Sequence, residues 1–164
     1  MSQHFSYSVS TVLSRDRVWA IFSDIENWPK FSDVYSNLRW SGVPWKSGSS
    51  LLGTLRFTRA MPVNYLLETC RSGSFLRYVG YSKEAGFASH RTVRFEQQQG
   101  RTMIVVDCYI VGTPTFAVAG GAYGFLRTLT ETWFRDFAAL CDTQAESNVE
   151  LEHRDTKSLA IRAL

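Results

Sequence analysis

Residues 17–32 read RVWAIFSDIENWPKFS, and this stretch decides the fold. Its first half places Val18, Ile21 and Phe22 on one helical face, and Ser14 just before it is a predicted N-cap. Trp28 precedes Pro29, and the residue before a proline is biased away from helical geometry. The stretch therefore predicts two short helices separated by a bend.

The sequence on both sides of these helices alternates between apolar and polar residues, as strands with one buried face do. One such segment, Phe5–Leu13, precedes the helices, and six follow them, each bounded by residues typical of turns. The six are Val34–Ser41, Ser49–Thr58, Val63–Arg71, Phe75–Tyr81, Ser89–Gln97 and Thr102–Val111. Sequential strands with short connections pair as an antiparallel meander, so the sequence predicts one seven-stranded sheet.

A final helix is predicted from about Tyr123 to Thr143, where an apolar stripe faces a charged one. Gly120, Gly121 and Gly124 weaken its start, which indicates a flexible gate or a close backbone crossing there. Residues 1–144 then form a single α+β domain. Residues 145–164 form a C-terminal tail, either solvated or docked on the body or on a second subunit.

A sheet of seven antiparallel strands must curl, and one amphipathic helix cannot fill its concave face. Either large side chains fill the remaining space or a chamber is left for a small apolar molecule. Residues 17–32, together with WSGVPWKSGS at residues 40–49, resemble the START-like (SRPBCC) superfamily, and more narrowly its polyketide cyclase/dehydratase and lipid-transport branch.

This resemblance implies the helix-grip fold, a curved sheet wrapped around a long C-terminal helix with a deep apolar cavity between them. It also implies ligands such as lipids, sterols, quinones or polyketides, with catalysis in a minority of members. Fold alone does not decide among these functions.

Strand alternation predicts which side chains face the enclosed space. On the first strand after the short helices it places Ser36 inward together with Trp40. Trp28 is expected to clamp the short helices. The predicted ligand-binding residues, which share an inward position on a strand or on the helix stripe, are Tyr7, Trp40, Phe57, Tyr65, Tyr78, Arg91, Phe95, Cys108, Leu126, Thr130 and Trp133.

Arg91 shares its parity with Val93 and Phe95, so its charged group is predicted to point into an apolar interior. A buried guanidinium needs a partner, and the nearest inward candidates, Tyr65 and Tyr78, carry only hydroxyls. Two interpretations follow. Arg91 either binds a carboxylate, phenolate or carbonyl oxygen at one end of an apolar ligand, or lies near the strand end and reaches solvent.

Composition excludes several other classes. The 164 residues are 45% apolar and 20% charged, as expected of one globular domain. A net charge of +3 without a basic run argues against nucleic acid, and the absence of a long apolar run argues against stable membrane insertion. Three cysteines at wide spacings fit neither a disulfide framework nor a zinc motif and favour a cytoplasmic location. No metal and no cofactor are predicted.

Three functions are consistent with these features. The first is binding or transport of a hydrophobic small molecule, such as a lipid, a quinone or a polyketide-like aromatic. The second is a polyketide cyclase or dehydratase acting in the same chamber, with Arg91 polarising a carbonyl and a tyrosine moving protons; no catalytic residue is assigned. The third is a filled core that functions through homodimerisation by the tail. A cavity of several hundred Å³ favours the first two, and a packed interior the third.

Overall fold

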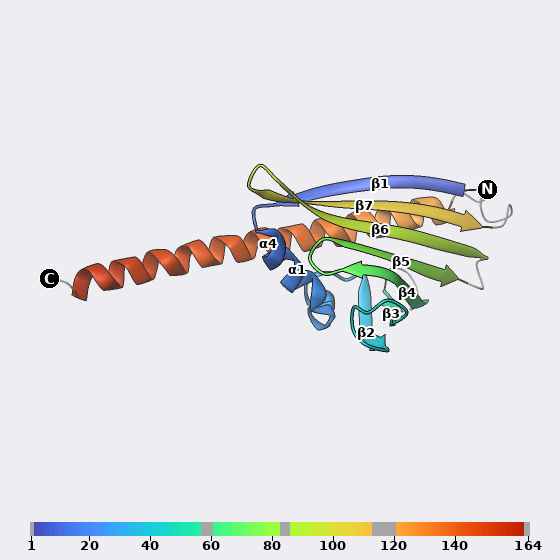
Figure 1. The fold of residues 1–164 in the computed structure, drawn as a ribbon, viewed down its shortest axis with the longest axis horizontal. Helices are drawn as coiled ribbons and strands as arrows, with labels where there is room; N and C mark the ends of the chain where they lie inside the picture. The colour runs from blue at the N-terminus through green and yellow to red at the C-terminus, as the bar shows by residue number, and fades with distance from the viewer. Residues whose placement is uncertain (1, 57–60, 83–85, 113–120, 163–164) are drawn as a thin grey trace.

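The structure is a computed structural model that describes residues 2–56, 61–82, 86–112 and 121–162. One strand and three short helical segments come first, six strands follow, and a long helix ends the described chain (Figure 1). The elements are β1 (Ser2–Thr11), α1 (Arg15–Ser23), η1 (Ile25–Asn27), α2 (Trp28–Phe31), β2 (Tyr35–Ser41), β3 (Ser50–Leu55), β4 (Met61–Arg71), β5 (Phe75–Ser82), β6 (Phe87–Gln98), β7 (Arg101–Gly112) and α4 (Gly121–Arg162).

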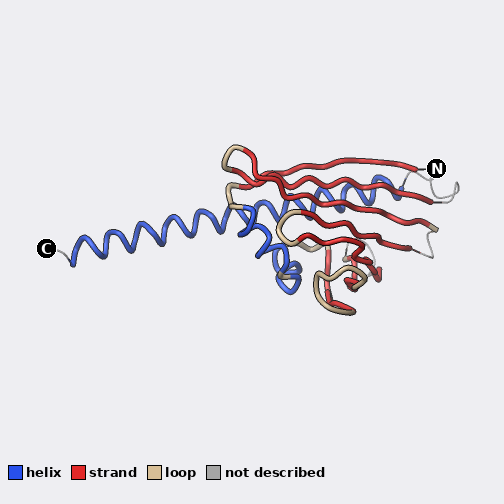
Figure 2. The backbone as a smooth tube through the Cα atoms, in the orientation of Figure 1, coloured by secondary structure: helices blue, strands red, loops and turns tan. Residues whose placement is uncertain are grey.

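The seven strands form one antiparallel sheet in the order β1-β7-β6-β5-β4-β3-β2. The first strand pairs with the last, in unbroken register from Ser2 opposite Val111 to Thr11 opposite Thr102. Figure 2 shows α4 running along the sheet and the short helices beside it. The predicted helix-grip architecture, with short helices directly after the first strand, is confirmed.

Helix α4 holds both ends of the edge strand β1. The Tyr123 hydroxyl donates to the carbonyl of His4 at 3.5 Å. At the other end, Asp142 accepts hydrogen bonds from the hydroxyl of Thr11 at 2.7 Å and from the backbone N–H of Val12 at 3.1 Å. Covering an edge with a helix is one way in which proteins keep it from pairing with other chains.

Asp142→Ala is expected to lower the free energy of unfolding by about 1–3 kcal/mol, because it leaves the fully buried Thr11 hydroxyl without its acceptor. Urea unfolding followed by circular dichroism measures the loss. Asp33→Ala removes a fully exposed carboxylate and serves as the control. Equal losses in both variants would contradict a structural role for Asp142.

An irregularity in β2 places Tyr35 inside the fold. The pairing of β2 with β3 shifts register between Ser36 and Arg39, and Asn37 has a φ of +53°. Asparagine tolerates this left-handed conformation better than most residues. Tyr35 is therefore buried while Ser36 is only half-buried, and the prediction that Ser36 faces inward is wrong. Strict alternation fails because an extra residue reverses the side-chain parity.

Phe22, from the stretch that decides the fold, stands at the centre of an aromatic core. Its side chain is 2% exposed. Six rings from α1, α2, α4, β6 and the loop after β2 have centroids 5.2–5.8 Å from its own: Trp19, Trp28, Trp45, Phe95, Trp133 and Phe137. The segment between β1 and β2 thus fixes the position of α4 against the sheet.

Helix α4 extends well beyond the predicted end at Thr143, continuing to Arg162, and its C-terminal half projects past the sheet (Figure 1). Docking of the tail stays a prediction. At its start, a Cβ added to Gly121 or Gly124 would meet no atom within 4 Å, so a close backbone crossing does not explain these two glycines. Gly120 lies outside the described residues.

Candidate functional site

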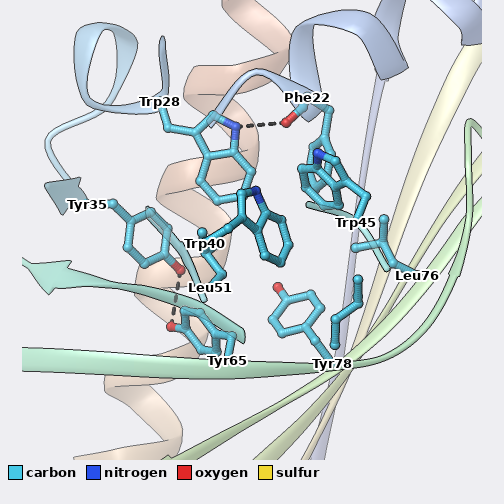
Figure 3. A pocket seen from close by; sticks show the side chains of 10 residues that line it. Phe22, Trp28, Tyr35, Trp40, Trp45, Leu51, Tyr65, Leu76 and Tyr78 are labelled. Atoms are coloured by element: carbon cyan, nitrogen blue, oxygen red, sulfur yellow. Dashed lines mark hydrogen bonds between the residues drawn. The ribbon is translucent and has the colours of Figure 1, made fainter. Parts of the chain in front are cut away.

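An aromatic cavity lies between the short helices and strands β2 to β5 (Figure 3). The centre of a water molecule can occupy about 30 Å³ of it, which is room for about two waters. Side chains therefore fill most of the space between the short helices and strands β2 to β5. The described residues that line the cavity are Phe22, Trp28, Tyr35, Trp40, Trp45, Leu51, Tyr65, Leu67, Leu76 and Tyr78.

Indole rings form one side of this cavity, and two of them are held by hydrogen bonds to the end of α1. Trp28 Nε1 donates to the carbonyl of Phe22 at 2.9 Å, as its predicted clamping role requires. Trp45 Nε1 donates to the carbonyl of Ser23 at 3.0 Å, and its ring centroid lies 4.9 Å from that of Trp40. Because both indole N–H groups are satisfied by backbone, the rings present apolar faces to the cavity.

Three tyrosines form the opposite side of the cavity (Figure 3). The hydroxyls of Tyr35 and Tyr65 are 3.3 Å apart, and the rings of Tyr65 and Tyr78 meet edge to face with centroids 5.4 Å apart. Burial raises the pKa of Tyr35 well above its ordinary value, with a further contribution from Tyr65. Burial also raises the pKa of Tyr78. Both phenols are therefore protonated at neutral pH and can donate hydrogen bonds.

Arg91 lies behind two of these rings. Its guanidinium carbon is 5.5 Å from the ring centroid of Tyr65 and 5.9 Å from that of Tyr78, as in cation–π contacts. The residue is 2% exposed, so the prediction that it reaches solvent is wrong. Among the described residues, its Nε and Nη2 atoms have no hydrogen-bond partner.

The guanidinium of Arg91 is charged. Burial alone would lower its pKa, but the neighbouring phenols of Tyr65, Tyr78 and Tyr35 outweigh this, and the pKa lies well above its ordinary value. No ion pair of Arg91 is found in the described part of the chain. The interior thus holds a positive charge that aromatic faces shield and that no carboxylate of the described residues neutralises.

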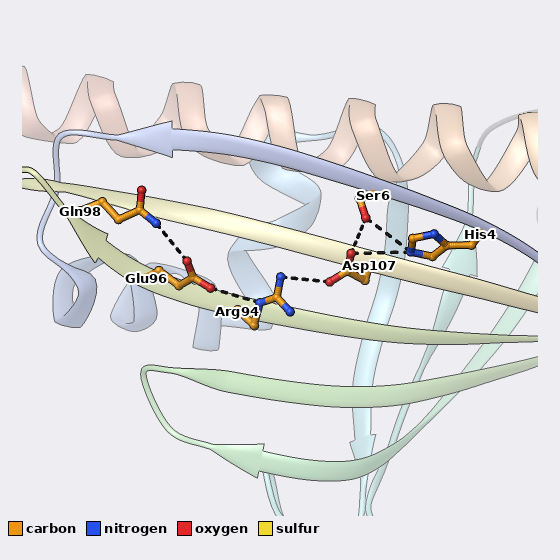
Figure 4. A network of polar contacts seen from close by, with 6 residues as sticks. All are labelled: His4, Ser6, Arg94, Glu96, Gln98 and Asp107. Atoms are coloured by element: carbon orange, nitrogen blue, oxygen red, sulfur yellow. Dashed lines mark hydrogen bonds and ion pairs between the residues drawn. The ribbon is translucent and has the colours of Figure 1, made fainter.

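On the outer face of the sheet, by contrast, an arginine is paired with carboxylates (Figure 4). Arg94, three residues after Arg91, contacts the carboxylates of Glu96 and Asp107, each at 3.2 Å. Ser6 and His4 lie beside Asp107, but the Ser6 hydroxyl donates directly to that carboxylate. The arrangement does not activate the serine, because the imidazole would have to accept that proton.

A second cavity lies beside the first turns of α4, with about 50 Å³ of room for the centre of a water molecule. Leu126 of α4, Gly80 of β5 and Ser89 of β6 line its inner part, and the exposed Met61 and Tyr81 line its outer part, so this cavity opens to the surface. Tyr65 lines both cavities.

The predicted ligand-binding residues fall into five groups. Trp40, Tyr65 and Tyr78 line the first cavity, and Leu126 and Tyr65 line the second. Arg91, Phe95, Cys108, Thr130 and Trp133 are buried behind these linings, and Trp133 Nε1 has no hydrogen-bond partner among the described residues. Tyr7 is only partly buried. Phe57 lies outside the described residues.

The ligand-binding residues predicted from the sequence do not include Phe22, Tyr35 or Trp45, which line the first cavity. Phe22 belongs to a helix, where strand alternation does not apply. Trp45 has a φ of +59° in the loop after β2, and this loop geometry carries no periodic signal. Asn37, a residue that tolerates positive φ, was the only available hint that β2 is irregular and that Tyr35 turns inward.

The described part of the chain offers neither a metal site nor a membrane-spanning helix. No group of three or more His, Cys, Asp or Glu side chains is placed to hold a metal ion. No helix there has both the length and the apolar composition needed to cross a membrane.

Comparison with solved structures identifies the fold. Ara h 8.0201 superposes with a TM-score of 0.73 at 10% identity, covering 86% of this chain and 98% of that one. Norcoclaurine synthase from Thalictrum flavum, solved with dopamine and hydroxybenzaldehyde, gives 0.65 at 12% identity, covering 85% and 86%. The di-domain ARO/CYC protein StfQ of the steffimycin biosynthetic pathway gives 0.74 at 11% identity, covering 88% of this chain and 52% of that one.

The protein therefore has the START-like helix-grip fold that the resemblance of residues 17–32 and 40–49 implied. No family model and no curated protein matches the sequence itself. Identities this low establish the fold alone and leave the function to be argued from the site.

Proposed function

We propose that the protein binds a hydrophobic small molecule between the sheet and α4, and that Arg91 binds an acidic or carbonyl oxygen of that molecule. The observation that carries this proposal is a buried, charged guanidinium with two unpartnered nitrogens behind an aromatic cavity. A core that served only for packing would be more stable without such a group, because a buried charge without a counter-charge is costly.

The small volume of the cavity limits what can bind without a rearrangement. Room for about two waters does not admit a ring system or an acyl chain, so binding requires lining side chains to move. This small volume taken alone favours the filled-core alternative. Nε and Nη2 of Arg91, which have no hydrogen-bond partner among the described residues, favour a ligand instead, because a ligand oxygen could accept hydrogen bonds from them.

The similar structures support a ligand with aromatic or polyketide character over the lipid and quinone alternatives. Norcoclaurine synthase was solved with two small aromatic compounds, and StfQ belongs to a biosynthetic pathway as an ARO/CYC protein. The lining of this chain, with three indoles and three phenols, offers such a ligand stacking surfaces.

Native mass spectrometry of protein purified without detergent or organic solvent tests the proposal. We expect a bound species that is released on unfolding, and its extraction should yield an apolar molecule carrying an oxygen function. Repeated absence of bound species, together with no thermal shift across a panel of fatty acids, quinones and polycyclic phenols, would overturn the proposal and favour the filled core.

A second candidate function is a cyclase or dehydratase that acts on the same ligand. It is favoured by the pairing of the Tyr35 and Tyr65 hydroxyls close to a charged guanidinium that can polarise a carbonyl, and by the burial that raises the pKa of Tyr35 and keeps it a proton donor. Conversion of the extracted compound by the wild type but not by Tyr35→Phe would support this candidate. Unchanged compound after prolonged incubation would support binding or transport.

A further inference from the structure

The two cavities meet at one side chain, and the second of them opens to the surface. Tyr65 is the residue that both linings share among the described residues, and its own side chain is buried. One cavity extends from it toward the indoles of α2 and the loop after β2, and the other toward the start of α4. Tyr65 thus forms a partition between the two cavities.

Strand register places Arg91 at the same partition. In the pairing of β5 with β6, Gly80 opposite Ser89 lines the second cavity, and the next inward pair along the strands is Tyr78 opposite Arg91. Tyr78 lines the first cavity. Arg91 therefore lies at the boundary between the two cavities, with the rings of Tyr65 and Tyr78 against its guanidinium.

The Tyr65 ring packs directly against Gly80 of the neighbouring strand. The two residues are directly opposite on β4 and β5, and a Cβ added to Gly80 would lie 2.8 and 2.9 Å from ring carbons of Tyr65. Any other residue at position 80 would force the ring to move. The partition therefore depends on a missing side chain in the neighbouring strand, which lets the ring approach the backbone of that strand closely.

We infer that Tyr65 determines the length of the ligand, and that the ligand is an elongated, largely apolar molecule with an acidic oxygen part-way along it. This inference rests on the proposed function. Displacing the ring joins the two cavities into one site and uncovers Arg91 at its middle. A ligand with its oxygen at one end would leave either the guanidinium or one cavity unoccupied.

Three fluorescent carboxylates test this inference. Anthracene-9-carboxylate carries its charge at the middle of three rings, anthracene-2-carboxylate carries it at one end, and 1-naphthoate has two rings. Dissociation constants are measured by fluorescence titration for the wild type, Tyr65→Ala and Tyr109→Ala. The last variant removes a tyrosine ring that is 51% exposed on the outer face of the sheet, and it serves as the matched control.

We expect Tyr65→Ala to bind anthracene-9-carboxylate at least tenfold more tightly than the wild type does, and 1-naphthoate within threefold, because the longer ligand needs both cavities. Tyr65→Leu should give a smaller change in the same direction and replaces Tyr65→Ala if that variant fails to fold. Anthracene-9-carboxylate should bind more tightly than anthracene-2-carboxylate to every variant.

Two outcomes overturn the inference and leave the proposed function intact. One is an equal gain for 1-naphthoate and anthracene-9-carboxylate in Tyr65→Ala, which would show that the ring does not limit length. The other is tighter binding of anthracene-2-carboxylate, which would place the ligand oxygen at one end. If no variant binds any of the three carboxylates while the extracted natural ligand does bind, this ligand class is wrong. If nothing binds, the proposed function fails with it.

Discussion

Phe22→Ala is expected to lower the free energy of unfolding by about 3–5 kcal/mol, the largest effect of any single substitution considered. The Phe22 ring touches six other aromatic rings from five elements of the fold, and the cavity left by its removal cannot collapse without moving α1, α4 and β6 together. Urea or thermal unfolding followed by tryptophan fluorescence measures the loss.

Phe75→Ala is the matched control for this prediction. Phe75 is half-buried at the start of β5 and its ring faces the guanidinium of Arg71, so its removal should cost much less. Losses of similar size in the two variants would show that Phe22 has no special place in the core.

Arg91→Met is expected to weaken binding of an anionic aromatic probe by about 10- to 100-fold, the loss of a hydrogen bond to a charged group. The probe is 8-anilinonaphthalene-1-sulfonate, and its neutral analogue N-phenyl-1-naphthylamine has the same rings without the sulfonate. Affinity for the neutral analogue should change by less than about threefold, because methionine fills a similar volume. Binding of both is measured by fluorescence titration.

The same substitution should leave the free protein as stable as the wild type or more stable, since it replaces a buried unpaired charge with an apolar side chain. Arg94→Met, which removes a charge from the outer face of the same strand, should bind both probes as the wild type does. An equal loss of affinity for both probes in Arg91→Met would mean that Arg91 shapes the cavity and does not recognise charge.

The pH dependence of this binding follows from the neighbouring phenols. Burial raises the pKa of Tyr35 and of Tyr78, so neither phenol loses its proton between about pH 7 and 9. The sulfonate therefore meets the same positive charge throughout that range, and its affinity should stay constant. A fall in affinity within that range would indicate that a group with a lower pKa takes part.

The strand elements and the inward position of Arg91 could be predicted from the sequence, because regular strands alternate and β6 has no irregularity. Strand alternation alone predicts that the Arg91 side chain points to the inner face of the sheet. It does not predict whether the guanidinium at the end of that side chain reaches solvent. Whether a long side chain at an inward position reaches water depends on its neighbours across the sheet, here Tyr65 and Tyr78.

Other parts of the site were outside the reach of pattern reasoning. Trp45 enters the cavity lining through a loop, and Tyr35 through a bulge that reverses parity in β2. The volume of the cavity was also beyond prediction, because it depends on how bulky rings from separate elements fit together. In the first cavity, room for about two waters is all that separates a filled core from the observed one.

The irregularity at Asn37 also concerns how this site could change over time. Because of the extra residue, Tyr35 and Trp40 both face inward although they are five positions apart. Removing a single codon there would restore regular alternation and leave Tyr35 opposite Leu55 and Trp40 opposite Leu51, so both rings would stay in the interior. A one-residue deletion in a regular part of a strand would instead turn the side chains on one side of it to the opposite face. The bulge is thus a position where the strand can change length without changing the cavity lining.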